Sequence, residues 1–331
     1  MKRLKRSRAA ELLEQFQARR ILVIGDLMLD EFLWGRARRI APEAPVPVVE
    51  IERETLHLGG AGNVAANLAA LGACPMVIGV IGADMAGERL REEFAQATIT
   101  TPALVVDKTR PTTIKTRVIA HSQHVVRTDR EKKTPVSAAI ERELADNFLE
   151  LLESAEAVIV SDYEKGVITP SLLQTILPAA AERRIPVCID PKLKNFQYYR
   201  PATIITPNQN EAEAIARIHI ENAETLELVG QRLRELLGDV NILITRGEEG
   251  MSLFQNKDEV VNVQAVAHEV YDVTGAGDTV VATLTLGIVS GASILEAAMI
   301  ANHAAGIVVG KVGTATVSTA EILTSMESLQ R

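Results

Sequence analysis

One eight-residue string carries the clearest chemical signature in the sequence. It is Asp272-Val-Thr-Gly-Ala-Gly-Asp-Thr279, and it opens a long stretch of small and apolar residues that favours a buried helix. Two glycines allow a tight turn that points successive N–H groups into one concavity, and the helix N-terminus adds partial positive charge. A carboxylate in the first helical turn can take a proton from an attacking hydroxyl while the N–H groups hold a phosphoryl group. The alternative is an ordinary N-capping aspartate, but the full string favours a phosphoryl-transfer site made of Gly275, Ala276, Gly277 and Asp278.

A second glycine turn opens an alanine-rich helix at residues 59–67. It contains Gly60-x-Gly62-x-x-Ala65, which matches the spacing of a dinucleotide-binding turn. No acidic ribose-binding residue follows in a strand–helix–strand context, which disfavours an NAD oxidoreductase. A polyol close to Gly60 and Asn63 explains the glycines equally well.

Two weaker motifs are set aside. The string at residues 306–312 is one residue short of a P-loop and has Val312 where that loop needs Ser or Thr. His121 and His124 are predicted to be a surface pair rather than a metal site.

Five short apolar runs are each followed by a polar residue, so these runs would position the polar side chains. The runs lie at 21–24, 158–160, 187–189, 204–207 and 242–245, and they are followed by Asp26, Asp162, Asp190, Asn208 and Arg246. Helical stretches at 137–153, 170–184, 209–217 and 224–237 alternate with them, which predicts an α/β fold with a parallel sheet covered on both faces. Ligands bind at the carboxyl ends of such strands, so the five polar residues are expected to face one cleft.

Two segments break this alternation. Residues 31–53 and 112–129 show partly alternating apolar and polar positions and no helical period. We interpret them as a small β-lid inserted into a single domain of residues 1–331.

Composition excludes several classes of protein. With 35 basic and 43 acidic side chains the net charge is −8, which argues against a nucleic-acid binder. The longest uncharged stretch, residues 279–295, contains glycines and serines and fits a helix and a turn better than a membrane span. Cys74 and Cys188 are expected to be buried, reduced thiols, and the basic start lacks a following apolar segment, so a cytoplasmic protein is expected.

The two glycine strings together resemble the signatures of the ribokinase-like (PfkB-type) carbohydrate kinases. Asn208-Gln-Asn-Glu211 and Thr245-Arg-Gly-Glu-Glu-Gly250 match two further family motifs in the same order. The resemblance implies a three-layer sandwich with a mostly parallel central sheet and a β-lid, and an ATP-dependent sugar kinase. It also implies that the lid pairs two chains into a homodimer.

The family resemblance assigns further residues to the ATP site and to metal ions. It implies that Asn208 and Glu211 organise Mg²⁺ and the nucleotide phosphates, with water between Glu211 and the metal. The nucleotide loop would be formed by Thr245, Arg246, Gly247 and Gly250, and the adenine pocket by Asn302, Ala305, Val270 and Val309. Asp272 is a candidate ligand for a monovalent cation such as K⁺.

Within the family, several strings resemble the heptose 7-phosphate kinases of lipopolysaccharide biosynthesis. They include Gly25-Asp-Leu-Met-Leu-Asp30, Ser161-Asp-Tyr-Glu-Lys-Gly166, Asp190-Pro-Lys192 and residues 309–317. The implied reaction is phosphorylation of the anomeric hydroxyl of D-glycero-β-D-manno-heptose 7-phosphate on the route to ADP-heptose. The substrate-binding candidates are then Asp26, Gly60, Asn63, Arg117, Asp162, Lys165, Asp190 and Lys192, with Arg127 as a further lid cation.

Three alternatives stay open at this stage. One is another sugar kinase of the ribokinase or ketodeoxygluconate kinase type. The second is a catalytically dead nucleotide- or sugar-sensing module, against which the intact Asp278 argues. The third is the NAD oxidoreductase disfavoured above. The sequence also lacks the His-x-Gly-His motif of a cytidylyltransferase-type domain, so a separate nucleotidyltransferase is expected.

Overall fold

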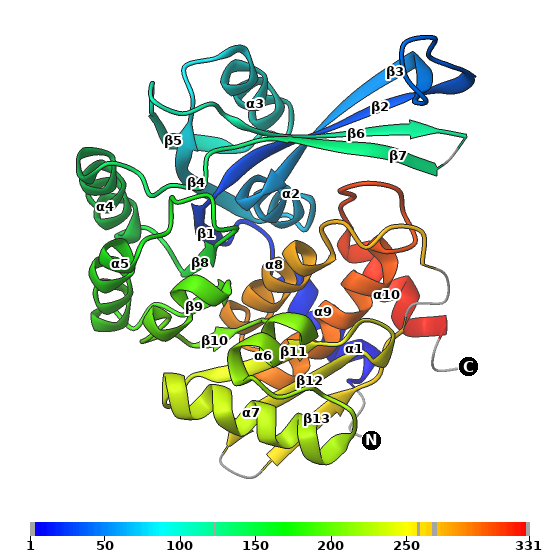
Figure 1. Cartoon of the computed structure of the whole chain (residues 1–331). Helices are drawn as coiled ribbons and strands as arrows, with labels where there is room; N and C mark the ends of the chain where they lie inside the picture. Colours follow the sequence, from blue (N-terminus) through cyan, green and yellow to red (C-terminus); the bar gives the residue numbers. More distant parts are fainter. Residues whose placement is uncertain (1–3, 122, 257–258, 267–269, 329–331) are drawn as a thin grey trace.

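A nine-stranded sheet forms the centre of the molecule in the computed structural model, which describes residues 4–121, 123–256, 259–266 and 270–328 (Figure 1). In hydrogen-bonded order its strands are β13 (Glu259–Val263), β12 (Met251–Asn256), β11 (Asn241–Thr245), β10 (Ile204–Ile205), β9 (Val187–Asp190), β8 (Ala157–Ser161), β1 (Arg20–Gly25), β4 (Cys74–Ile81) and β5 (Thr100–Val106). The pairings from β11 to β5 are parallel, whereas β12 and β13 are antiparallel. The carboxyl ends of the parallel strands therefore meet at one edge.

Both faces of this sheet are covered by helices. Side chains of β1 alternate: Ile21 and Val23 belong to one apolar core, and Leu22 and Ile24 belong to the other. The first core includes α1 (Arg6–Glu14), α2 (Ala61–Ala70), α3 (Met85–Gln96), α8 (Ala276–Val289), α9 (Ile294–Val308) and α10 (Thr319–Ser328). The second includes α4 (Ala138–Leu152), α5 (Pro170–Glu182), α6 (Gln209–Ala216) and α7 (Ala223–Leu237). The predicted three-layer sandwich is confirmed.

A separate four-stranded sheet, which we call the lid sheet, projects from the main body beside α3 (Figure 1). Its order is β3 (Pro47–Gly60), β2 (Leu27–Ile40), β6 (Thr113–Ala120) and β7 (Gln123–Arg130), and only β2 and β6 run parallel. It contains most of the segments expected from the sequence, but β2 starts earlier and β3 ends later than residues 31–53. Asp26 is the single residue between β1 and β2.

The remaining elements differ from expectation in two respects. The five apolar runs are all strands and the predicted helices are present within one or two residues. Strands β4, β5, β12 and β13 were not predicted, although β4 contains no charged residue and is itself an apolar run. Cys188 is buried as expected, whereas Cys74 is exposed because it begins β4 at the surface; both thiols are free. Among the described residues, no helix combines the length and apolar character needed to cross a membrane.

Candidate active site

Asp278 lies in the first turn of α8, where only 2% of its surface is exposed. The Tyr163 hydroxyl donates to its Oδ1 at 2.7 Å, and Asn63 Nδ2 donates to its Oδ2 at 2.8 Å. Burial raises the pKa of Asp278 to about 7, although these two hydrogen bonds oppose the rise. A carboxyl group of this pKa can exchange a proton near neutral pH.

The glycine turn before Asp278 is shaped by two different requirements. Gly275 caps α8 with a φ of 79°, and a Cβ there would collide with the amide of Asn63. Gly277 has no atom within 4 Å of the position of a Cβ, so its backbone borders open space at the helix N-terminus. Together with Ala276, the turn presents helix N–H groups toward that space, which suits an anion.

The second glycine turn joins the first through α2. Gly60 caps α2 with a φ of 57°, and Asn63 lies in its first turn. Thr279 Oγ1 donates to Asn67 Oδ1 at 2.9 Å, so α2 and α8 are connected by two buried side-chain bonds, of which Asn63–Asp278 is the other. The structure thus brings both sequence motifs to one place.

Asp26 and Asp162 hold the loop that carries Tyr163. Asp26 accepts the backbone N–H groups of Tyr163, Lys165 and Val167 at 2.8, 3.0 and 3.1 Å. Burial, followed by the charge of Asp162, raises the pKa of Asp26 to about 6. The Asp162 carboxylate accepts the backbone N–H of Glu164 and side-chain bonds from Asn195 and Tyr199. These contacts organise the loop, a task that the sequence did not suggest for either aspartate.

Asp30 is a site residue that the sequence reasoning missed. It is buried on β2, pairs with the guanidinium of Arg117 on β6, and its carboxylate lies beside Gly59. Its negative charge also contributes to raising the pKa of Asp278. The Arg117 side chain is largely engaged by this pair and by the Phe32 ring, 5.2 Å from its Cζ. The signal available in the sequence was the second aspartate of the string 25–30.

Lys165 and Lys192, both predicted to bind the substrate, contact different carboxylates. Lys192, which follows β9, pairs with Glu211 and lies 5.5 Å from the centre of the Tyr163 ring. Lys165 Nζ lies 2.7 Å from Glu131 Oε2, beyond the end of β7. Burial raises the pKa of Asp190 well above its ordinary value, against the opposing charge of Lys192. Lys192 and Asp190 therefore face the Asp278 side, and Lys165 faces the lid sheet.

The family's Asn-x-x-Glu motif begins α6 as a capping box. Asn208 Oδ1 accepts the N–H of Glu211 at 2.9 Å, and Glu211 Oε2 accepts the N–H of Asn208 at 3.0 Å. The other carboxylate oxygen of Glu211 pairs with Lys192. Since both oxygens already have partners, a cation here fits best through bridging water.

The loop after β11 offers an open backbone. Thr245 ends that strand, and Arg246 Nε is buried with no hydrogen-bond partner. Gly247 has a φ of 55° with no atom within 4 Å of a Cβ position, and Gly250 has a φ of 84°. An unpaired guanidinium nitrogen beside a side-chain-free turn is compatible with a nucleotide.

Two further loops close this region. Asn302 Nδ2 donates to the carbonyl of Gln264 at 2.7 Å. Val309 accepts the N–H groups of Tyr271 and Asp272, and the Asp272 carboxylate accepts N–H groups of Thr274 and Gly313. Those bonds lower the pKa of Asp272 although burial opposes them. Of the other predicted adenine contacts, Ala305 is partly buried on α9, the helix that carries Asn302, and Val270 is exposed directly before Tyr271.

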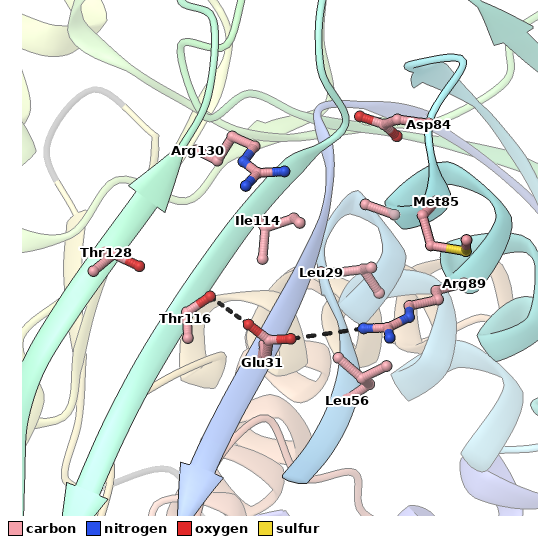
Figure 2. A pocket seen from close by; sticks show the side chains of 11 residues that line it. Leu29, Glu31, Leu56, Asp84, Met85, Arg89, Ile114, Thr116, Thr128 and Arg130 are labelled. Atoms are coloured by element: carbon pink, nitrogen blue, oxygen red, sulfur yellow. Dashed lines mark hydrogen bonds and ion pairs between the residues drawn. The ribbon is translucent and has the colours of Figure 1, made fainter. Parts of the chain in front are cut away.

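A separate pocket of about 460 Å³ lies on the opposite face of the lid sheet, against α3 (Figure 2). Figure 2 shows Glu31 at its centre, accepting from Thr116 and lying 3.8 Å from Arg89. Asp30 and Glu31 are consecutive on β2, so they point to opposite faces of the sheet. The Glu31–Arg89 ion pair in this pocket joins the lid sheet to α3. The pocket is distinct from the Asp278 site.

The geometry of a carboxylate at a glycine-led helix N-terminus agrees with the comparison to known families. The sequence matches the pfkB family carbohydrate kinase over residues 18–321. The chain belongs to this family, so the protein is a sugar kinase, and the family resemblance seen in the sequence is confirmed.

Individual relatives narrow the comparison. The chain is 48% identical over 305 residues to the "Bifunctional protein HldE" of Pelobacter propionicus and 47% identical over 321 residues to that of Trichlorobacter lovleyi. These matches cover 92% and 97% of this chain but 62% and 65% of the relatives, so the chain spans less than two thirds of their length.

Solved structures confirm the fold. Phosphofructokinase-2 from Escherichia coli in complex with potassium has a TM-score of 0.77 at 19% identity, with 95% of this chain and 100% of that one covered. Arabidopsis thaliana ribokinase complexed with ribose and ATP has a TM-score of 0.74 at 20% identity, with 94% and 99% covered.

Proposed function

We propose that this sugar kinase transfers a phosphoryl group from ATP to the anomeric hydroxyl of D-glycero-β-D-manno-heptose 7-phosphate. The substrate is supported by the strings shared with heptose 7-phosphate kinases and by identity of 47–48% to proteins named HldE. The product would be the 1,7-bisphosphate, used in ADP-heptose and lipopolysaccharide synthesis.

The observation that carries the proposal is the buried Asp278 carboxylate at the N-terminus of α8. Asp278 accepts the proton of the sugar hydroxyl as the sugar oxygen bonds to the γ-phosphorus, and the bond from that phosphorus to ADP breaks. The N–H groups around Gly277 stabilise the charge on the phosphoryl oxygens. Asp278 then releases its proton to solvent, which its pKa of about 7 permits.

Sugar positioning is assigned to the residues around that carboxylate. Asn63 holds Asp278, and Gly60 lets the backbone approach the sugar closely. We assign direct contact with sugar hydroxyls to Asp30, oriented by Arg117, in addition to Asn63. Asp26 and Asp162 act by fixing the loop of Tyr163.

We place the ATP site at the open turns around Gly247 and Gly277. Gly247 and Gly277 leave room for nucleotide phosphates, and Arg246 has a buried nitrogen free to donate. Asn208 and Glu211 would hold Mg²⁺ through water, and the metal would neutralise charge on the nucleotide phosphates. A monovalent cation beside Asp272 would have to use backbone carbonyls as well, since that carboxylate already accepts two N–H groups.

A substrate screen by ADP release tests the activity. Heptose 7-phosphate, the same heptose without its phosphate, ribose and ketodeoxygluconate are compared at equal concentration. Highest kcat/KM with heptose 7-phosphate supports the proposal. Preference for ribose or ketodeoxygluconate would assign another kinase activity, and no ADP release with any sugar would indicate a sensing module.

We also propose that two chains pair through their lid sheets. Exposed apolar side chains occur on this small sheet, namely Ile40, Ile51, Val125 and Val126, and Val46 is exposed in the turn before β3. An isolated four-stranded sheet with such a surface gains by packing on a second copy. Light scattering should give a dimer for the wild type and a monomer for Ile51→Lys with Val126→Lys. Val106→Lys, an exposed position on β5, is the control.

A further inference from the structure

A cluster of charged side chains joins the lid sheet to the loop after β8. Lys115 on β6 and Lys165 both approach the carboxylate of Glu131, with Nζ–Oε2 distances of 3.9 and 2.7 Å. These three side chains are only 14%, 12% and 10% exposed. They form a half-enclosed site rather than a solvated surface patch.

The cluster is adjacent to the proposed sugar site. Lys115 pairs in register with Asp30 across β2 and β6, so both side chains leave the same face of the lid sheet. Lys165 lies two residues after Tyr163, and its backbone N–H donates to Asp26. The hydroxyl of Tyr163 in turn donates to Asp278. A ligand that reaches from Asp278 past Asp30 therefore comes to Lys115 and Lys165.

The charges in this cluster do not balance. Its ion pairs join four cations to two carboxylates: Lys115, Lys133, Lys165 and Arg127 surround Asp129 and Glu131. The surplus is two positive charges, and it comes from the two exposed cations, Lys133 at 69% and Arg127 at 55% exposed. The enclosed lysines, Lys115 and Lys165, are balanced by Asp129 and Glu131, so a phosphate monoester near −2 would bind them by taking the place of a carboxylate. Glu131 alone contacts three of the lysines, so it acts as their internal counter-ion.

We propose that Lys115 and Lys165 bind the phosphate that the acceptor sugar already carries, and that Glu131 occupies their ammonium groups until it arrives. This inference rests on the proposed function, because it places the far end of a phosphosugar. A sugar without the phosphate leaves Glu131 paired with the lysines and gains no binding energy from the cluster, so a phosphosugar binds more tightly than its unphosphorylated form. Lys192 belongs to the nucleotide side, through its contact with Glu211.

Steady-state kinetics on lysine variants tests the site. Lys165→Met and Lys115→Met should each raise KM for heptose 7-phosphate roughly 10–100-fold, since each removes a charge-assisted hydrogen bond. KM for ATP should stay near wild type. Lys132→Met is the matched control, because this half-buried lysine donates to the carbonyl of Thr109 instead. An unchanged sugar KM, or an equal rise in the ATP KM, would overturn the proposal.

Inorganic phosphate gives a readout that does not depend on the sugar's identity. Isothermal titration should detect its binding to wild-type protein, loss of binding in Lys165→Met and tighter binding in Glu131→Gln. The double variant Lys165→Met with Glu131→Gln removes both charges of the Lys165–Glu131 ion pair, so it should still fold and should fail to bind phosphate. Phosphate binding lost in the variants while the enzyme prefers an unphosphorylated sugar would refute the proposed function and keep the anion site. Equal phosphate binding by wild type and both lysine variants would refute the anion site alone.

Discussion

The hydroxyl of Tyr163 donates a 2.7 Å hydrogen bond to the carboxylate of Asp278, although the two residues are 115 positions apart. Tyr163 is fixed by its own N–H bond to Asp26, at the junction of the main sheet and the lid sheet. The loop after β8 therefore orients the proposed base Asp278 through Tyr163 and also carries Lys165, which pairs with Glu131 beside the lid sheet. Movement of this loop would alter the hydrogen bond to Asp278 and the Lys165–Glu131 ion pair together.

Asp278→Asn should abolish turnover while ATP still binds. The amide keeps the shape of the carboxylate and can still accept from Tyr163, but it cannot take the hydroxyl proton. Loss of a positioned base costs about 10²–10⁴ in rate. ADP release gives kcat, and calorimetric ATP titration controls for folding and binding. Turnover close to wild type would remove Asp278 from the mechanism.

Tyr163→Phe should shift the pH profile rather than eliminate activity. The Tyr163 bond favours the charged carboxylate and lowers the pKa of Asp278, so its removal raises that pKa above about 7. The acidic limb of the kcat profile should move to higher pH, with a larger loss at pH 6 than at pH 9. Tyr198→Phe serves as the control, because this side chain is partly buried against the second apolar core, which includes α4 to α7. A uniform loss across the pH range would indicate a purely structural role for Tyr163.

The sequence located the site better than it located the individual contacts. The strand ends and both glycine turns are local features, so the spacing of apolar residues and glycines was enough to predict them. The pair Asn208 and Glu211 was named through the family resemblance, and their capping box at α6 was not predicted. Asp26 was predicted as a sugar ligand and Asp30 was missed, because the role of Asp30 depends on the register of β2 with β6, which places Arg117 beside it. The direction of Lys165 was equally hidden, since its partner Glu131 lies in the segment after β7.

The contribution of Asp26 and Asp278 to the free energy of unfolding should fall as pH rises from about 4 to about 7. Their pKa values of about 6 and about 7 exceed the ordinary 3.8, so the folded state holds more protons than the unfolded state in this window. His57 and His303 act in the opposite sense because burial lowers their pKa values. Comparing the wild type with Asp278→Asn isolates the contribution of the Asp278 carboxyl group to the pH dependence of stability.

The measurement is urea unfolding of both proteins at pH 5 and pH 8. Relative to the wild type, Asp278→Asn should gain about 2–3 kcal/mol more at pH 8 than at pH 5. The same difference at both pH values would show that the pKa of this carboxyl is not raised in the folded protein.

Glu211→Gln should raise the Mg²⁺ concentration needed for half-maximal activity by roughly 10-fold or more, which is the usual effect of losing a group that orients metal-bound water. Glutamine can still accept the N–H of Asn208 and begin α6, but it loses the charge that faces Lys192 and the proposed cation. The KM for the sugar should change less, because Asp30 and Asn63 are untouched. Glu213→Gln on the same helix is the control, since that carboxylate contacts His219 at 2.8 Å instead. An unchanged Mg²⁺ titration combined with a weakened sugar KM would place Glu211 on the sugar side and remove it from the metal site.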